Sequence, residues 1–327
     1  MTKPDRWIEE TFHPHWRVRL QADKVIHEVK TDHQHLVIFD NATWGRVLML
    51  DGVCQLTTSD EFVYHEMMAH VPLMALKAPR RVLVVGGGDG GVMREVLKHP
   101  SIEKATLCEI DRSVVDLSLA HYPEIAGGCF EDSRCDLVIA DGLKYVAETP
   151  EKFDAIIVDS SEPIGPSAVL HTPEFFADCR RALRDGGIFV TQNGLPFLLP
   201  DHLAGTTRAL GPLFAKVAPY LCTQPCYFGG PFALNWASDD ASALDISVKK
   251  LKRRRDKRGI STRYWTPSVH VAAFALPRYV EMVVEQALAA PSPAVDVPAQ
   301  SPAPKARRGR KQPSAKPARK PRRPVSR

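Results

Sequence analysis

The sequence predicts an α/β protein in which a small N-terminal antiparallel β domain precedes a doubly wound sheet with helices on both faces. Strand-like runs joined by tight-turn signals fill the first ~70 residues. From Arg81 onward, strand-like and helix-like segments alternate, and the strands are apolar on both faces, as in a buried parallel sheet. We therefore expect a β-hairpin domain with its connecting helix at 1–76, a larger α/β domain at 77–290 and a disordered basic tail at 291–327.

The N-terminal elements are predicted from short apolar runs and one turn signal. Strands are expected at 36–41 and 44–50, and Asp51-Gly52 gives a tight turn into a third strand at 53–57. A helix is expected at 60–76, with Asp60 as the capping residue of its first turn. Its predicted apolar stripe consists of Phe62, Met67, Met68, Val71 and Met74.

The larger domain is predicted from the alternation of apolar runs with helical periodicity. Strands are expected at 82–85, 105–110, 136–140, 153–159 and 187–192, with helices between them at 91–98, 112–120, 143–148 and 173–183. Two further strands are expected at 215–221 and 232–237, and a helix follows Pro277. The basic stretch at 249–258 is interpreted as a solvated helix face.

The charge of the chain is unevenly distributed. Lys and Arg number 43 against 38 Asp and Glu, which gives a formal net charge of +5. The tail from Pro291 carries eleven Lys and Arg and only one acid, Asp296, so the rest of the chain has a net charge of −5. With almost no large apolar residue, the tail cannot offset the entropy of ordering. A nucleic-acid-binding function is the alternative from another class, but the tail has no aromatic residue for stacking, so only weak, salt-sensitive contacts are expected.

The cysteines and the N-terminal residues indicate a cytoplasmic protein. Seven cysteines, an odd number without a CxxC pair, are typical of reduced thiols. No matching ligands accompany Cys222 and Cys226, so we expect no metal there. The first residues are charged and lack the apolar core of a signal peptide, and no apolar run approaches the ~18 residues of a membrane span.

A glycine-rich loop between a strand and a helix predicts a nucleoside site. Gly86, Gly88 and Gly91 satisfy GxGxxG in the context of a Rossmann-like, methyltransferase-type sheet. Glu109 ends the next strand, where an acid accepts the two hydroxyls of a ribose. Asp141, followed by Gly142, closes the third strand at the position of an acid that reads an adenine amino group.

The loop residue Asp89 separates the candidate nucleosides. NAD(H) and S-adenosylmethionine-type ligands both use such strand ends, but a pyrophosphate or a carboxylate would meet the negative charge of Asp89. At ~4 Å and an effective dielectric of ~20, two like charges repel by about 4 kcal/mol. A ligand with an ammonium group and no carboxylate is attracted instead, and decarboxylated S-adenosylmethionine is such a ligand.

A second group of acids follows the fourth strand. Asp159 and Glu162 stand at its carboxyl edge, where open α/β sheets place ligands. With Asp89, Glu109 and Asp141 at neighbouring strand ends, they form an anionic cleft. An acidic cleft selects a cationic substrate.

The chain as a whole resembles the spermidine synthase family of aminopropyltransferases from roughly Trp7 to Leu288. The motifs that carry the resemblance are Thr31-Asp-His-Gln34, Leu50-Asp-Gly-Val-Cys-Gln55, Asp60-Glu-Phe-Val-Tyr64-His-Glu66, GGGDGG at 86–91, Glu109-Ile-Asp111, Ala140-Asp141-Gly142, Asp159-Ser-Ser-Glu-Pro-Ile-Gly-Pro, Gln192-Asn-Gly and Tyr227-Phe-Gly-Gly. The resemblance implies transfer of the aminopropyl group of decarboxylated S-adenosylmethionine, a co-substrate, to putrescine. The products would be spermidine and 5′-methylthioadenosine, made by a homodimer or homotetramer with no further cofactor and no metal.

The resemblance also implies a role for each matching residue. Asp159 is the expected general base, and Tyr64 and Tyr227 are expected to position the acceptor amine. The expected donor contacts are Gln34, Gly86, Gly88, Asp89, Glu109, Asp141 and Gly142, with Glu109 on the ribose and Asp89 on the aminopropyl ammonium. The remaining expected substrate contacts are Gln55, His65, Glu162 and Gln192.

One departure from the family bears on the acceptor. Glu162 stands where the family usually has Asp; it keeps the charge but is one methylene longer. An enzyme that prefers another diamine, diaminopropane or cadaverine, is therefore an alternative. An S-adenosylmethionine-dependent methyltransferase is a further alternative, which Asp89 and the acidic loop after Asp159 disfavour.

Overall fold

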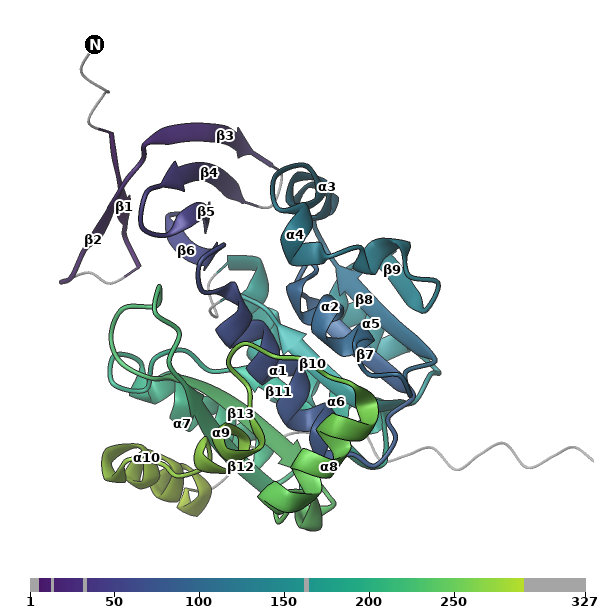
Figure 1. Cartoon of the computed structure of the whole chain (residues 1–327). Helices are drawn as coiled ribbons and strands as arrows, with labels where there is room; N and C mark the ends of the chain where they lie inside the picture. The colour runs from purple at the N-terminus through teal and green to yellow at the C-terminus, as the bar shows by residue number, and fades with distance from the viewer. Residues whose placement is uncertain (1–5, 13–14, 32–33, 162–164, 291–327) are drawn as a thin grey trace, which may run out of the picture. The chain divides into compact units, whose positions relative to one another are not determined.

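Two kinds of sheet follow each other along the chain in the computed structural model, which describes residues 6–12, 15–31, 34–161 and 165–290 (Figure 1). The first part pairs β1 (Trp7–Glu10) with β2 (Val18–Gln21) and builds a four-stranded antiparallel sheet. The strands of that sheet, in spatial order, are β3 (Lys24–Lys30), β4 (His35–Asn41), β5 (Gly45–Leu50) and β6 (Val53–Thr57). The predicted hairpins are thus confirmed. Asp51 and Gly52 both have positive φ, 48° and 77°, as a tight turn between β5 and β6 requires.

The inner strand β4 is buried on both faces: alternate residues of a strand point to opposite sides, and both sets are covered. Val37 and Phe39 of β4 join one apolar cluster with Cys54 of β6. Leu36 and Ile38 join another, which includes Tyr122 and Ile125 beside α4 (Pro123–Ala126). The second cluster ties the N-terminal sheet to the α/β part of the chain.

Helix α1 (Glu61–Ala75) connects the two parts, and two expectations about it are wrong. It is buried on nearly every side, with Phe62 the one half-buried residue, so it has no single apolar stripe. The cause is its position between the large sheet and helices α2 and α8. Asp60 does not cap the helix with its side chain. Its carboxylate accepts instead from Thr57 Oγ1 (2.6 Å) and from the backbone N–H of Cys226 (2.7 Å).

The seven-stranded sheet has the order β12-β13-β11-β10-β7-β8-β9. Its parallel strands are β7 (Arg81–Gly86), β8 (Lys104–Glu109), β9 (Cys135–Ile139), β10 (Phe153–Asp159) and β11 (Leu183–Gln192). Antiparallel pairing adds β13 (Phe232–Ser238) and then β12 (Lys216–Cys222). The chain leaves β7 in one direction and later starts β10 on its other side, so the topological switch point lies between them. Gly86 and Asp159 are register partners there.

Helices cover both faces of this sheet, which confirms the doubly wound prediction (Figure 1). Helices α1, α2 (Gly91–Leu97) and α8 (Val248–Arg258) pack on one face, and α5 (Gly142–Glu148), α6 (Pro173–Ala182) and α7 (Pro200–Leu210) on the other. The remaining helices are α3 (Arg112–His121), α9 (Pro267–Ala272) and α10 (Arg278–Ala289), of which α10 packs on α7. Among the described residues, none of the helices has the length and hydropathy needed to span a bilayer.

The basic helix α8 is only partly a solvated face, which corrects our interpretation of 249–258. Arg254 donates to the carbonyls of Met74 and Ala75 at 2.5 and 2.6 Å. Arg258 donates to three more carbonyls at the end of α1, those of residues 73, 76 and 77, at 2.8 to 3.0 Å. The two arginines thereby satisfy carbonyls that a helix leaves unpaired at its C-terminus.

The described part of the chain forms one compact unit. The boundary proposed between 76 and 77 stays a prediction. Glu162 and the tail at 291–327 lie outside the described residues. All seven cysteines are free thiols, and six of them are buried.

Candidate active site

A cavity of about 210 Å³ opens at the switch point of the large sheet. The ends of β7, β8, β9 and β10 form its floor, and β6 and α1 supply further walls. Every site residue predicted from the sequence, apart from Glu162, lines this cavity: Gln34, Gln55, Tyr64, His65, Gly86, Gly88, Asp89, Glu109, Asp141, Gly142, Asp159, Gln192 and Tyr227. The structure therefore brings together residues that lie up to 193 positions apart in the chain.

The nucleoside half of the cavity is organised around Glu109. Its carboxylate accepts from the backbone N–H of Gly88 (3.2 Å) and of Asp111 (2.9 Å). Burial raises the pKa of Glu109 to about 6, against the effect of these N–H groups. Gln34 donates to Asp111 at 3.3 Å. These contacts fix the carboxylate and the amide at the mouth of the glycine loop.

Asp141 lines the cavity and also caps helix α5. Its side chain accepts from the backbone N–H of Leu143 (2.9 Å) and so caps α5. Gly142 lies against Val85, where an added Cβ would come within 2.6 Å of that side chain. Position 142 therefore has no room for a side chain on this side, and the Gly142 backbone packs directly against Val85 in the lining of the cavity, where the adenine is expected.

The glycine loop is shaped by the acids and the histidine of the site itself. A Cβ on Gly87, whose φ is +70°, would lie 2.5 Å from Asp159 Oδ2. A Cβ on Gly91 would lie 2.2 Å from the ring of His65. The missing side chains at Gly87 and Gly91 therefore leave room for Asp159 and His65.

Asp159 is the best-placed base in the cavity. The hydroxyl of Tyr64 donates to its Oδ1 at 2.8 Å. Its Oδ2 is buried and accepts no hydrogen bond from the residues that the structure describes. Burial and the neighbouring charge of Asp89 raise the pKa of Asp159 to about 7, although His65 acts in the opposite direction. One carboxylate oxygen is thus held by Tyr64, while the other is buried without a hydrogen bond from the described residues, in a side chain that lines the cavity.

Aromatic rings and two amides line the cavity beside Asp159. Tyr64 and Tyr227 meet edge to face with centroids 6.3 Å apart, and Tyr227 lies 5.0 Å from Phe232. The hydroxyl of Tyr227 donates to the carbonyl of Gln55. Gln192 donates to the carbonyl of residue 161 (3.1 Å) and accepts from the N–H of residue 194 (2.9 Å). Aromatic faces beside acids favour an organic cation.

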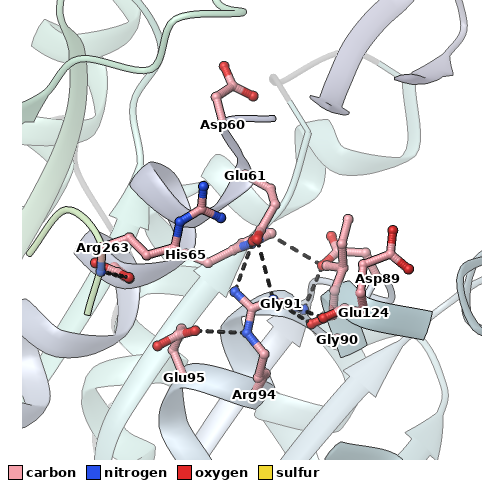
Figure 2. Close-up of polar contacts among 12 residues, drawn as sticks. Asp60, Glu61, His65, Asp89, Gly90, Gly91, Arg94, Glu95, Glu124 and Arg263 are labelled. Carbon is pink, nitrogen blue, oxygen red and sulfur yellow. Dashed lines mark hydrogen bonds and ion pairs between the residues drawn. The ribbon is translucent and has the colours of Figure 1, made fainter. Parts of the chain in front are cut away.

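Two functional neighbours, Glu61 and Arg94, were not predicted. Figure 2 shows His65 between Glu61 and Asp89, with Arg94 reaching Glu61 from α2. The signal in the sequence was the spacing of Glu61 and His65, since residues four apart share a helix face. Nothing local in the sequence indicates that Arg94 belongs to this group.

The cluster of His65, Asp89 and Asp159 has the geometry of a cation site. One ligand atom from each of the three residues lies within 4.8 Å of the others. The charges of Asp89 and Glu61 overcome burial and raise the pKa of His65 to about 9. A protonated imidazole donates a hydrogen bond instead of ligating a metal.

Comparison with known proteins agrees with this geometry. A family model described as the spermine/spermidine synthase domain matches residues 61–247, more than half of the chain. The chain belongs to the spermine/spermidine synthase family. A second model, described as the spermidine synthase tetramerisation domain, matches residues 6–58.

Similar proteins and structures support the same assignment. The polyamine aminopropyltransferase of Ruegeria sp. (strain TM1040) is 49% identical over 281 residues, which cover 86% of this chain and 99% of the relative. That of Pseudomonas syringae pv. tomato is 47% identical over 279 residues, 85% of this chain and 98% of the relative. A spermidine synthase crystallised with the transition-state analogue AdoDATO has a TM-score of 0.82 at 35% identity, covering 86% of this chain and 96% of its own. The spermidine synthase of Thermotoga maritima has a TM-score of 0.81 at the same identity and covers 86% of this chain and 95% of its own.

These findings confirm the resemblance and the fold seen in the sequence. The chain is an enzyme of the aminopropyl-transfer class. Neither family model extends into the basic tail.

Proposed function

We propose that the enzyme transfers the aminopropyl group of decarboxylated S-adenosylmethionine to putrescine, forming spermidine and 5′-methylthioadenosine. The observation that supports this most is the position of Asp159: the residue lines a cavity ringed by acids, and its buried Oδ2 accepts no hydrogen bond from the described residues. An acidic cavity attracts a cationic amine substrate, and a base within it can remove a proton from the reacting amine.

The donor is assigned to the half of the cavity that contains the glycine loop. Glu109 is proposed to accept the ribose hydroxyls and Asp141 the adenine amino group, with Gln34 and the backbone at Gly86, Gly88 and Gly142 beside them. Asp89 is proposed to accept the aminopropyl ammonium. A carboxylate on the donor would be repelled there by about 4 kcal/mol at ~4 Å and an effective dielectric of ~20.

The acceptor is assigned to the aromatic side. Tyr64, Tyr227 and Gln192 are proposed to orient the near amine, with Gln55 and His65 at the junction with the donor. Glu162, outside the described residues, is proposed to hold the far ammonium of the diamine. Its extra methylene leaves diaminopropane and cadaverine as candidate acceptors beside putrescine.

The chemical step is a displacement at carbon. The amine lone pair forms the new C–N bond as the C–S bond of the sulfonium breaks, and the electron pair leaves on a neutral thioether. A primary amine with a pKa of ~10.4 must first lose a proton, and Asp159, at about 7, lies about 3.4 units below it, or about 5 kcal/mol. The donor's sulfonium lowers the pKa of the amine, and in-line positioning contributes ~7–11 kcal/mol.

The N-terminal strands are proposed to assemble the enzyme into a homo-oligomer. The support is the match of residues 6–58 to the tetramerisation model. The strands of the described N-terminal sheets all pair antiparallel, and residues of β5 and β6 line the active-site cavity.

Product identification tests the proposed function. The full-length enzyme is supplied with decarboxylated S-adenosylmethionine and, in separate reactions, diaminopropane, putrescine and cadaverine. Putrescine is expected to give spermidine and equimolar 5′-methylthioadenosine at the highest kcat/KM. A higher kcat/KM for another diamine would change the acceptor, and no 5′-methylthioadenosine with any diamine would refute the proposal.

The pH dependence of the reaction follows from Asp159. Because its pKa is raised to about 7 and the base must be ionised, kcat/KM for the diamine is expected to fall about tenfold per pH unit below ~7 and to level off above it. Initial rates between about pH 5.5 and 8.5 at constant ionic strength check this. A profile that is flat from about pH 5.5 to 7 would remove Asp159 from the role of base.

A further inference from the structure

A buried histidine lies where the substrate ammonium is expected to bind. The side chain of His65 is 3% exposed on α1. Its Nδ1 is 2.6 Å from Glu61 Oε2, and its Nε2 is 3.5 Å from Asp89 Oδ1 (Figure 2). One ring nitrogen is therefore held by an acid beneath the cavity and the other points at an acid of the cavity.

Glu61 is in turn held by Arg94. Arg94 Nη2 donates to Glu61 Oε2 at 2.9 Å, and its Nη1 donates to the carbonyl of Ile125 at 2.8 Å. Its Nε donates to Glu95 Oε1 at 2.8 Å. Burial raises the pKa of Glu61, but the hydrogen bonds from His65 and Arg94 outweigh it and hold the pKa below its usual value, which favours an ionised carboxylate beside His65.

The acids around His65 lie on three different elements. Glu61 faces it from its own helix, Asp89 from the β7–α2 loop and Asp159 from the end of β10; Arg94 reaches it only through Glu61. Tyr64 adds a ring contact at 5.7 Å between centroids. Although burial favours the neutral ring, the acids raise the pKa of His65 to about 9, which favours the imidazolium at neutral pH.

We propose that His65 is the cation that occupies the acid cluster of the empty site, and that a substrate ammonium bound at Asp89 replaces it by expelling the Nε2 proton to solvent. This inference rests on the proposed donor. The total charge of the cluster is conserved, because one bound cation leaves as another arrives.

The exchange is balanced at each atom. The Nε2–H bond breaks, its electron pair stays on Nε2 and the proton leaves through the cavity. Nδ1–H continues to donate to Glu61. The freed Nε2 lone pair then accepts a hydrogen bond from the ammonium, which gives that cation a second partner beside Asp89.

The electrostatic effect is large enough to drive this exchange. A like charge at about 4 Å lowers the pKa of an imidazolium by roughly three units at an effective dielectric of about 20. Starting from about 9, the pKa of His65 would fall to roughly 6 when the ammonium is bound. Near pH 8 the ring is then mostly charged in the empty enzyme and mostly neutral in the complex.

Titration calorimetry in two buffers of different ionisation enthalpy measures the released proton. At about pH 8 Asp159 and Glu109 are already mostly ionised, so they release little. Decarboxylated S-adenosylmethionine is expected to release close to one proton per site. The control ligand 5′-methylthioadenosine carries the same nucleoside without the ammonium and the sulfonium, and should release close to none.

Variants test whether the proton comes from His65. Glu61→Gln removes one of the three acidic charges that keep the ring protonated, so release at about pH 8 should fall below about half a proton and reach its maximum at lower pH. Glu66→Gln is the matched control: Glu66 is a buried acid on the same helix, but it accepts from the backbone N–H groups of 263–265 and faces away from the cavity. It should leave the release unchanged. If Glu61→Gln does not fold, the pH dependence of the wild-type enzyme provides the test. At about pH 9.5 only about a quarter of the His65 rings are protonated, so proton release should fall to about a quarter of a proton per site.

The outcomes separate this inference from the proposed function. Binding and turnover of decarboxylated S-adenosylmethionine without proton release would overturn the role of His65 and leave the reaction intact. Equal release with 5′-methylthioadenosine would overturn it too, since the ammonium would not be the cause. Failure of the donor to bind at all would instead refute the proposed function.

Discussion

Replacing Asp159 with Asn is expected to lower kcat for aminopropyl transfer by roughly 10²- to 10⁴-fold, the usual contribution of a general base. The Asn side chain is isosteric, so the hydrogen bond from Tyr64 to Oδ1 is retained and the cavity keeps its shape. What is lost is the ionisable Oδ2, the proposed acceptor of the amine proton. Donor binding should change by less than about fivefold, because the ribose and adenine contacts are elsewhere.

Steady-state kinetics and equilibrium binding of the donor measure the two effects separately. The residual activity of the variant should keep rising with pH towards the pKa of the free amine, since only the neutral amine then reacts. Asp154→Asn is the control: Asp154 lies on the same strand, but it pairs with Arg184 and the backbone at 80 and 81, away from the cavity. Near-normal turnover of the Asp159 variant would exclude this residue as the base.

Asp89→Asn should weaken the binding of decarboxylated S-adenosylmethionine by roughly 10- to 100-fold, as expected for the loss of a charge-assisted hydrogen bond of about 1.5–3 kcal/mol. In the wild-type chain the backbone N–H of Gly91 donates to Asp89 Oδ1 at 2.6 Å. The amide oxygen of Asn can still accept this hydrogen bond, so the glycine loop should keep its conformation. Binding of 5′-methylthioadenosine, which lacks the ammonium, should change by less than about threefold.

The comparison of the two ligands decides the role of Asp89. Both dissociation constants are measured by calorimetry at the same pH and salt, because screening alters such contacts. A similar loss for both ligands would mean that the substitution disturbs the loop and that Asp89 does not read the ammonium. The variant should also discriminate less against the carboxylated donor, which its charge no longer repels.

The sequence was sufficient to predict that residues at the strand ends gather in one cavity. Gly86, Glu109, Asp141 and Asp159 each follow or end an apolar run, and parallel strands bring their carboxyl ends to one edge. These predictions rest on local patterns that tertiary packing does not override. The pairing of Gly86 with Asp159 depends on β10 lying beside β7, a spatial order that was not predicted from the sequence.

The features that sequence reasoning missed depend on packing between distant segments. Asp60 has the sequence of a helix cap, but the N–H of Cys226 competes successfully for its carboxylate. Arg254 and Arg258 look like a solvated basic face, yet they bind the carbonyls at the end of α1. Arg94 looks like an ordinary helix residue until α2 is packed beside Glu61. In each case the partner is at least 33 residues away, so no local pattern records it.

The most direct test of the proposed reaction is the mass of the acceptor after a competition between donors. The full-length enzyme is given putrescine together with equal concentrations of decarboxylated and carboxylated S-adenosylmethionine. Because the acids around Asp89 and Asp159 favour a donor with an ammonium and no carboxylate, putrescine should gain an aminopropyl group and become spermidine. Putrescine that gains a methyl group instead would contradict the proposed function.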